Sequence, residues 1–136
     1  FPIIESYFIV QCEYEKYPKI TLIDAHIVSD EFSLGDTITM KYKIQNCDSE
    51  EIRVGLGASI RHFETGHVIY DPENDKLVKL EKNKISEHSR MFKIPDQINI
   101  RTGYYDIEMG VWEGQPGDSS RPIHSTGWIS KQFQVG

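Results

Sequence analysis

One stretch of the sequence carries aromatic rings and carboxylates at every second residue. Tyr104, Asp106, Glu108 and Trp112 share one parity in the segment that opens at Gly103, and an extended strand would place them on one face. Aromatic rings stack on the C–H faces of pyranose rings while neighbouring carboxylates bind sugar hydroxyls, and the same residue types anchor protein interfaces. The segment therefore predicts binding to a protein or to a glycan, with packing at the core or its rim as the alternative.

A long polar loop follows this segment and ends at a second tryptophan. The loop covers residues 113–127 between Trp112 and Trp128, and its cationic groups are Arg121 and His124. Loops of this length between strands are uncommon and are often functional. If the final strand pairs with residues 103–112, the two tryptophans could lie near one another. The predicted binding residues are Tyr104, Asp106, Glu108, Trp112, Arg121, His124 and Trp128.

Arrangements typical of catalysis do not accompany these groups. The run Gly57-Ala58-Ser59-Ile60 only superficially resembles the nucleophile elbow of hydrolases, since no strand-to-helix transition follows it. Glycine loops of the phosphate-binding kind are absent from the sequence. Asp106 and Glu108 would lie about 7 Å apart along a strand, a spacing common on solvated sheet faces. Without a nucleophile, a base and oxyanion donors, we predict that the chain is not an enzyme.

The acidic segment Asp71-Pro72-Glu73-Asn74-Asp75 is the best candidate for a metal-binding loop, because calcium prefers such oxygen ligands. An EF-hand would require Gly and Glu where this chain has Lys76 and Lys82. The five histidines show no paired spacing, and zinc requires three or four ligands. We therefore expect a solvated turn here and predict neither a metal nor a cofactor.

The charge balance excludes several classes of partner. The formal net charge is −6, from 15 basic and 21 acidic residues. General nucleic-acid binding needs a basic surface that neutralises phosphates, and docking on anionic lipid needs the same. The sequence also lacks an apolar run of the roughly 20 residues that span a bilayer. We therefore predict a soluble chain with no nucleic-acid partner and no membrane insertion.

The chain has two cysteines, Cys12 and Cys47, and no Cys-x-x-Cys pair. A zinc ribbon or a thioredoxin-type centre is thereby excluded. A disulfide requires the two Cα atoms to lie within about 7 Å of one another. We expect free thiols, with a disulfide as the alternative.

Strands with apolar residues at alternate positions must position these side chains. The clearest are residues 36–46, 51–61 and 103–112, in which one parity is apolar and the other polar. Gly55 and Gly57 share the polar parity, which permits a bulge, a close backbone approach or a large side chain laid across the bare strand. Further predicted strands are residues 20–28, 68–70, 77–80, 86–94 and 129–135, the last interrupted by Lys131.

The stretch FKIPDQINIRTGYYDIEMGVW, residues 92–112, resembles the late hairpin of bacterial immunoglobulin-like accessory domains. The run Gly35-Asp36-Thr37-Ile38, the run RVGLGASI at 53–60 and the turn Thr65-Gly66 look like the domain beside sugar-export ATPases. The step Gly103-Tyr104-Tyr105 also looks like a tyrosine corner, in which a hydroxyl ties down a loop. The resemblance covers about 100 residues. It implies the fold and not the function, because function varies freely within such folds.

The fold that we predict is all-β: an immunoglobulin-like antiparallel two-sheet β-sandwich of about 8–9 strands. Residues 18–136 would form the sandwich, and residues 1–17 a further strand or a linker arm. We expect a non-catalytic accessory module of a larger bacterial protein, which recognises another protein or a neighbouring domain. A carbohydrate-binding module that uses Trp and Tyr beside carboxylates is the alternative.

Overall fold

The computed structural model describes residues 20–97, 100–114 and 122–136. These residues form ten strands and one short 3₁₀ helix. The strands are β1 (Ile20–Ile27), β2 (Glu31–Phe32), β3 (Thr37–Asn46), β4 (Ile52–His62), β5 (Val68–Tyr70), β6 (Lys76–Leu80), β7 (Ile85–Lys93), β8 (Gly103–Trp112), β9 (Pro122–Ser125) and β10 (Ile129–Val135), and the 3₁₀ helix is η1 (Pro72–Asn74).

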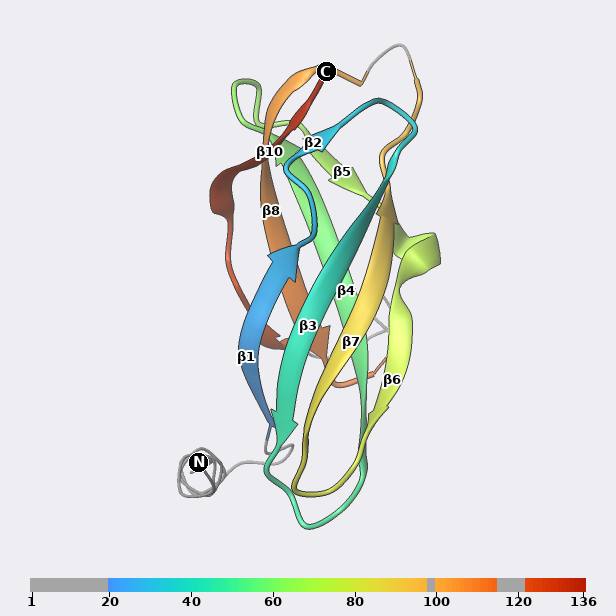
Figure 1. Ribbon diagram of the computed structural model, residues 1–136, viewed down its shortest axis with the longest axis vertical. Helices are drawn as coiled ribbons and strands as arrows, with labels where there is room; N and C mark the ends of the chain where they lie inside the picture. The colour runs from blue at the N-terminus through green and yellow to red at the C-terminus, as the bar shows by residue number, and fades with distance from the viewer. Residues whose placement is uncertain (1–19, 98–99, 115–121) are drawn as a thin grey trace.

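The strands form two facing sheets (Figure 1). The small sheet has the order β1-β3-β7, and the large sheet has the order β2-β10-β8-β4-β5, with β6 also paired to β4 and β9 to β8. The pairs are antiparallel except for a short parallel contact between β2 and β10. The predicted all-β two-sheet sandwich is confirmed. Strands β2 and β9 were not predicted, because they are too short to show a period. The immunoglobulin-like assignment stays a prediction.

The core lies between the two sheets and is built from the alternating apolar residues that the sequence shows. On β3, Ile38, Met40, Tyr42 and Ile44 are fully buried. Residues of β4 and β8 with the same alternation face them across the core. Burial of one large apolar side chain contributes about 1.5–3 kcal/mol, so this alternation decides which face of each sheet is covered.

Strand β10 contains an irregularity that explains its polar interruption. Ile129 pairs with Ile107 and Phe133 pairs with Tyr105, so the chain of β10 bulges between them. Lys131 lies in the bulge at a φ of 49°. The bulge returns Phe133 to the core, where it is buried, and it places the lysine outside. A lysine at a core parity is thereby accommodated without burial of its charge.

The predicted tyrosine corner is present. The hydroxyl of Tyr105 donates a hydrogen bond to the carbonyl of Arg101 at 2.5 Å, and its ring is buried and stacks on Phe133 with centroids 5.5 Å apart. Burial raises the pKa of this hydroxyl, so it remains a donor. The bond fixes the start of β8, the strand that carries most of the predicted binding residues.

The expectation of free thiols is wrong for Cys47, which is disulfide-bonded. The chain's other cysteine, Cys12, lies outside the described residues. Cys47 directly follows Asn46, which pairs with Ile20 at the start of β1. The pairing of β1 with β3 places Ile20 close to Cys47. The spacing of the cysteines in the sequence could not predict this proximity.

Two further expectations concern the domain boundary and membrane insertion. Residues 1–17, the predicted arm, lie outside the described part, so the domain boundary stays a prediction. Among the described residues there is no helix long and apolar enough to cross a membrane.

Candidate ligand-binding groove

The outward face of the large sheet carries a groove of about 580 Å³. It crosses the middle of β4 and β8, between η1 on one side and β9 on the other. We call it the outer groove. It is lined by Gly57, Ala58, Ser59, Tyr70, Asp71, Pro72, Asp75, Glu108, Gly110, Trp112, Pro122, His124 and Ser125.

Paired glycines form the floor of the outer groove. Gly57 of β4 lies directly opposite Gly110 of β8, and Gly55 lies opposite Trp112. A Cβ atom placed on Gly110 would lie 3.4 Å from Nε1 of Trp112 and 3.4 Å from the carbonyl oxygen of His124. The Nε1 edge of the indole therefore lies against the backbone of Gly110.

Aromatic side chains stand on both sides of this floor. Tyr70 of β5 pairs with Ser59 of β4 and is 69% exposed. Trp112 of β8 is partly buried at the other side. A glycine floor between two rings forms a slot whose walls offer flat apolar faces. Such a slot suits a ligand that has flat C–H faces of its own.

The polar rim of the groove consists of carboxylates held by the protein's own donors. The Oδ2 atom of Asp71 accepts hydrogen bonds from the amide of Asn74 at 2.6 Å and from the backbone N–H of Lys93 at 2.7 Å. The Oε2 atom of Glu108 accepts one from the hydroxyl of Ser125 at 3.2 Å. Fixed acceptors at the edge of an aromatic slot are suited to ligand hydroxyls.

A buried ion pair supports the wall at η1. Arg90 of β7 has a side-chain exposure of 0%, and its Nη2 lies 2.7 Å from Oδ1 of Asp75. The same nitrogen donates to the carbonyl of Asp71 at 2.6 Å. Burial raises the pKa of Asp75, and the bond and charge of Arg90 offset only part of that rise. Arg90 thus reaches across from the small sheet to fix two carboxylate-bearing residues of the groove.

A second contact ties the floor to the small sheet. The hydroxyl of Tyr42, on β3, donates a hydrogen bond to the carbonyl of Gly57 at 2.6 Å. Burial raises the pKa of this hydroxyl far above its ordinary value, so it stays a neutral donor. The floor is therefore held from the core side by a side chain of the facing sheet.

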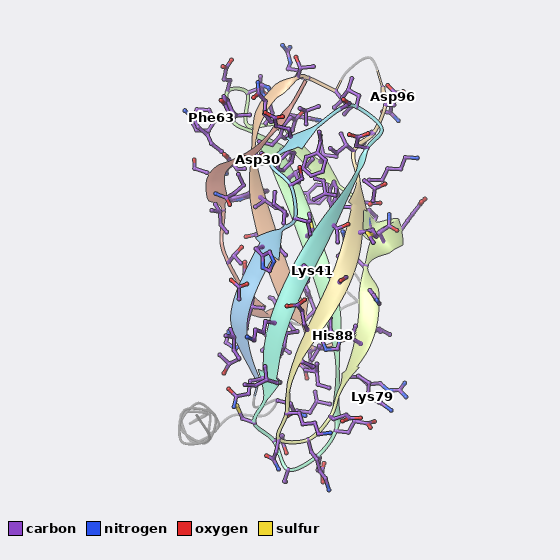
Figure 2. The ribbon with its side chains drawn as sticks, in the orientation of Figure 1. Asp30, Lys41, Phe63, Lys79, His88 and Asp96 are labelled. Atoms are coloured by element: carbon purple, nitrogen blue, oxygen red, sulfur yellow. The ribbon has the colours of Figure 1, made fainter. Side chains whose placement is uncertain are left out.

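The upper half of the same face carries a second group of side chains, Arg61, Phe63, Tyr104, Trp128 and Lys131, which we call the cation–aromatic cluster. The guanidinium of Arg61 lies 4.4 Å from the ring centroid of Trp128. The ammonium of Lys131 lies 4.4 Å from the ring of Phe63 and 5.8 Å from that of Tyr104. Figure 2 shows Phe63 projecting from the hairpin after β4, at the upper left.

Asp106 organises this cluster from below. Its side chain is 3% exposed, and its Oδ2 accepts from Nε of Arg61 at 3.0 Å. Its Oδ1 accepts from the backbone N–H of Lys131 at 3.0 Å. Asp106 lies on the outward parity, as the alternation predicts, but it is covered by its partners. In this structure it holds the cluster together and is not open to a ligand.

The structure divides the predicted binding residues between the two regions. Glu108, Trp112 and His124 line the outer groove. Tyr104, Asp106 and Trp128 belong to the cation–aromatic cluster, and Arg121 lies outside the described residues. Trp112 is at the last position of β8 and pairs with β4 and β9, whereas Trp128 precedes Ile129, which pairs with Ile107. The two tryptophans are therefore in different regions rather than in one patch.

His124 has a supporting position at one end of the groove. Its Nε2 lies 2.8 Å from the carbonyl oxygen of Ile20, at the start of β1. In the sheet, His124 pairs with Val111 of β8. The imidazole therefore links β9 to the small sheet, and β9 is a strand within the segment predicted to be a loop.

Sequence reasoning missed the wall opposite Trp112, formed by Tyr70, Asp71 and Asp75. The acidic segment at η1 is not a plain solvated turn, because Asp71 and Asp75 are bonded to β7 and line the groove. The available signal was Arg90, a charged residue at a core parity that needs a buried partner. Among the described residues, no three His, Cys, Asp or Glu side chains converge into a metal site.

No protein-family model matches the sequence, and no curated protein matches it either. Among solved structures the fold is similar to the C-terminal domain of wzt, with a TM-score of 0.60 at 14% identity over 86% of this chain and 73% of that one. This confirms, for the fold, the resemblance to an accessory β-sandwich domain.

Two larger proteins contain a similar region. One is the alkylpurine DNA glycosylase AlkC of Pseudomonas fluorescens, with a TM-score of 0.54 at 15% identity over 85% of this chain and 30% of that one. The other is a β-glucuronidase of Bacteroides uniformis, with a TM-score of 0.52 at 11% identity over 79% of this chain and 12% of that one. At these identities the likeness concerns the fold alone.

Proposed function

We propose that this chain is a non-catalytic accessory module that binds carbohydrate in the outer groove. The observation that carries the proposal is the groove in which the paired glycines Gly57 and Gly110 lie between the rings of Tyr70 and Trp112. A pyranose ring has two flat C–H faces and a rim of hydroxyls. The aromatic walls match the faces, and the acceptors at Asp71 and Glu108 match the rim.

The groove offers binding groups rather than a catalytic set. Among the described lining residues, Ser125 donates to Glu108 and the imidazole of His124 is bonded to Ile20. A nucleophilic serine would need an adjacent base held by a third group, and this arrangement supplies none. Asp75 is engaged by Arg90. These contacts support a module that holds a glycan without cleaving it.

The test is a titration of the domain with a broad panel of oligosaccharides, followed by tryptophan fluorescence and calorimetry. Trp112→Ala and Tyr70→Ala should each weaken binding at least about tenfold, which corresponds to about 1.4 kcal/mol. Trp128→Ala and Tyr104→Ala are the matched controls, since they remove aromatic rings from the same face outside the groove, and their affinity should be unchanged. Thermal unfolding of each variant separates loss of binding from loss of fold. A flat response of the wild-type domain across the panel overturns the proposal.

A specific observation favours protein recognition as a second function. In the cation–aromatic cluster, Phe63 and Tyr104 are 42% and 49% exposed although both are large and apolar. Rigid aromatic rings beside Arg and Lys are the residue types that protein interfaces favour. We propose that this cluster contacts a neighbouring domain in the longer protein to which the module belongs.

Hydrogen exchange tests this second function. Amides at the ends of β4 and β8, beside Phe63 and Tyr104, should exchange more slowly in the longer protein than in the isolated domain. The double variant Phe63→Ser/Tyr104→Ser should remove the difference without lowering the glycan affinity. Equal exchange in the two proteins would contradict the interface and leave the groove proposal untouched.

A further inference from the structure

The charged side chains that line the outer groove, among the described residues, are carboxylates. They are Asp71, Asp75 and Glu108, and the lining includes neither Lys nor Arg. Since this inference rests on the proposed carbohydrate-binding function, it concerns which glycans the groove admits. We propose that the groove selects neutral and amino sugars and rejects glycans that carry carboxylate, sulfate or phosphate groups.

Arg90, the cation that contacts this rim, is already bonded within the protein. The guanidinium of Arg90 is fully buried and is bonded to Asp75, to the carbonyl of Asp71 and to the carbonyl of Met91. Its charge offsets that of Asp75, so the negative charge that remains comes from Asp71 and Glu108. The charged donors that a site for acidic sugars would present, such as a forked Arg, are not directed into this groove by the described residues.

The two remaining carboxylates have acceptor capacity to spare. Ser125 donates to Oε2 of Glu108, and both donors at Asp71 reach its Oδ2. Each carboxylate thus keeps a second oxygen that the described residues leave to a ligand. An ionised carboxylate accepts hydrogen bonds and cannot donate them. It can bind a hydroxyl or an ammonium group, but against an anionic substituent it has only repulsion to offer.

The other half of the face shows the opposite charge. Lys131 lies in the cation–aromatic cluster beyond the groove. Arg61 lies there too, with its charge offset by Asp106. An acidic glycan would therefore meet repulsion in the aromatic slot and attraction outside it. Charge complementarity favours a neutral or cationic sugar as the occupant of the slot.

The experiment compares glycans that differ in one substituent. For each neutral oligosaccharide that binds, its uronic-acid counterpart and its 2-amino counterpart of the same linkage and length are titrated by calorimetry at low and at moderate salt. We expect the uronic acid to bind at least about tenfold more weakly and the amino sugar to bind as tightly or more tightly. The advantage of the amino sugar should shrink as salt screens the carboxylates.

The variant Glu108→Gln tests whether the charge of Glu108 causes the discrimination against uronic acids. It keeps the shape and the acceptor but removes the charge, so the ratio of the neutral affinity to the uronic-acid affinity should fall by several-fold, whatever the change in the neutral affinity itself. Glu87→Gln, on β7 of the small sheet, is the matched control and should change neither value. Acidic glycans that bind as well as neutral ones overturn the selectivity but leave carbohydrate binding intact. Absence of binding to every glycan overturns both.

Discussion

The two regions on the outward face of the large sheet each depend on a buried ion pair. The buried partner is the cation in one pair and the carboxylate in the other. At the groove, Arg90 is fully buried while Asp75 lines the cavity. At the cation–aromatic cluster, Asp106 is buried while Arg61 is 33% exposed beside Trp128. In each pair one partner is fully covered, and the other is the more exposed one.

This difference in the sign of the buried charge explains how one sheet face presents two surfaces of different charge. The groove presents acceptors between aromatic walls, and the cluster presents cations between aromatic rings. A buried charge is stable only with a partner, so each inner charge fixes the sign of the group that it places outside. The comparison predicts that removal of the inner charge disturbs each region more than removal of an outer one.

The largest effect is expected for Arg90→Met. The substitution leaves Asp75 without its buried partner and removes bonds to two carbonyls. Loss of one partner of a buried pair costs about 3–5 kcal/mol, and urea unfolding measures it. Arg53→Met, at an exposed position of β4, is the control. A loss below about 1 kcal/mol, as for a surface pair, would show that η1 does not depend on this arginine.

Asp106→Ala should have the next largest effect. It leaves the backbone N–H of Lys131 and the guanidinium of Arg61 without their acceptor, which costs about 1–3 kcal/mol. The fluorescence of Trp128 should change as Arg61 moves away from its ring. Glu108→Ala, on the same strand at the groove rim, should cost less than about 0.5 kcal/mol. Equal costs would remove the distinction between the buried carboxylate and the rim carboxylate.

A smaller effect that depends on pH is expected for Asp75→Asn. The pKa of Asp75 is raised in the folded state because of burial. Its contribution to the free energy of unfolding is therefore complete below its unfolded pKa and declines as the pH rises through the folded value. The variant should be more destabilised, relative to wild type, at pH 3 than at pH 7. A difference of the opposite sign would mean that the Arg90 charge outweighs burial.

The smallest effect is expected for Lys131→Gly. Glycine relieves the left-handed backbone at a φ of 49° but loses the contacts of the ammonium with Phe63 and Tyr104. These contacts contribute about 0.5–1 kcal/mol at an exposed site, and the relief is of similar size. The net change in thermal stability should therefore stay within about 1 kcal/mol. A larger loss would show that the outer cation, and not Asp106, holds the cluster.

Much of the strand pattern could be predicted, because alternation is a local property. Strands β5, β8 and β10 have the predicted bounds. Strand β3 begins one residue later than predicted, and β4 is shifted by one residue at both ends. The outward parity of Tyr104, Glu108 and Trp112 was also predictable. The position of Trp128 was not, since the bulge in β10 changes the register between Ile129 and Phe133.

The sequence by itself determined the class of fold and the face on which the candidate site lies, since period two assigns each residue to the core or to the outside. Only the tertiary structure decided that Gly57 meets Gly110, that η1 faces Trp112 across the floor, and that the seven predicted residues separate into a groove and a cluster. The partners involved are distant along the chain, as Arg61 and Asp106 are. Strand register and sheet order set such contacts, and a local period carries no information about either.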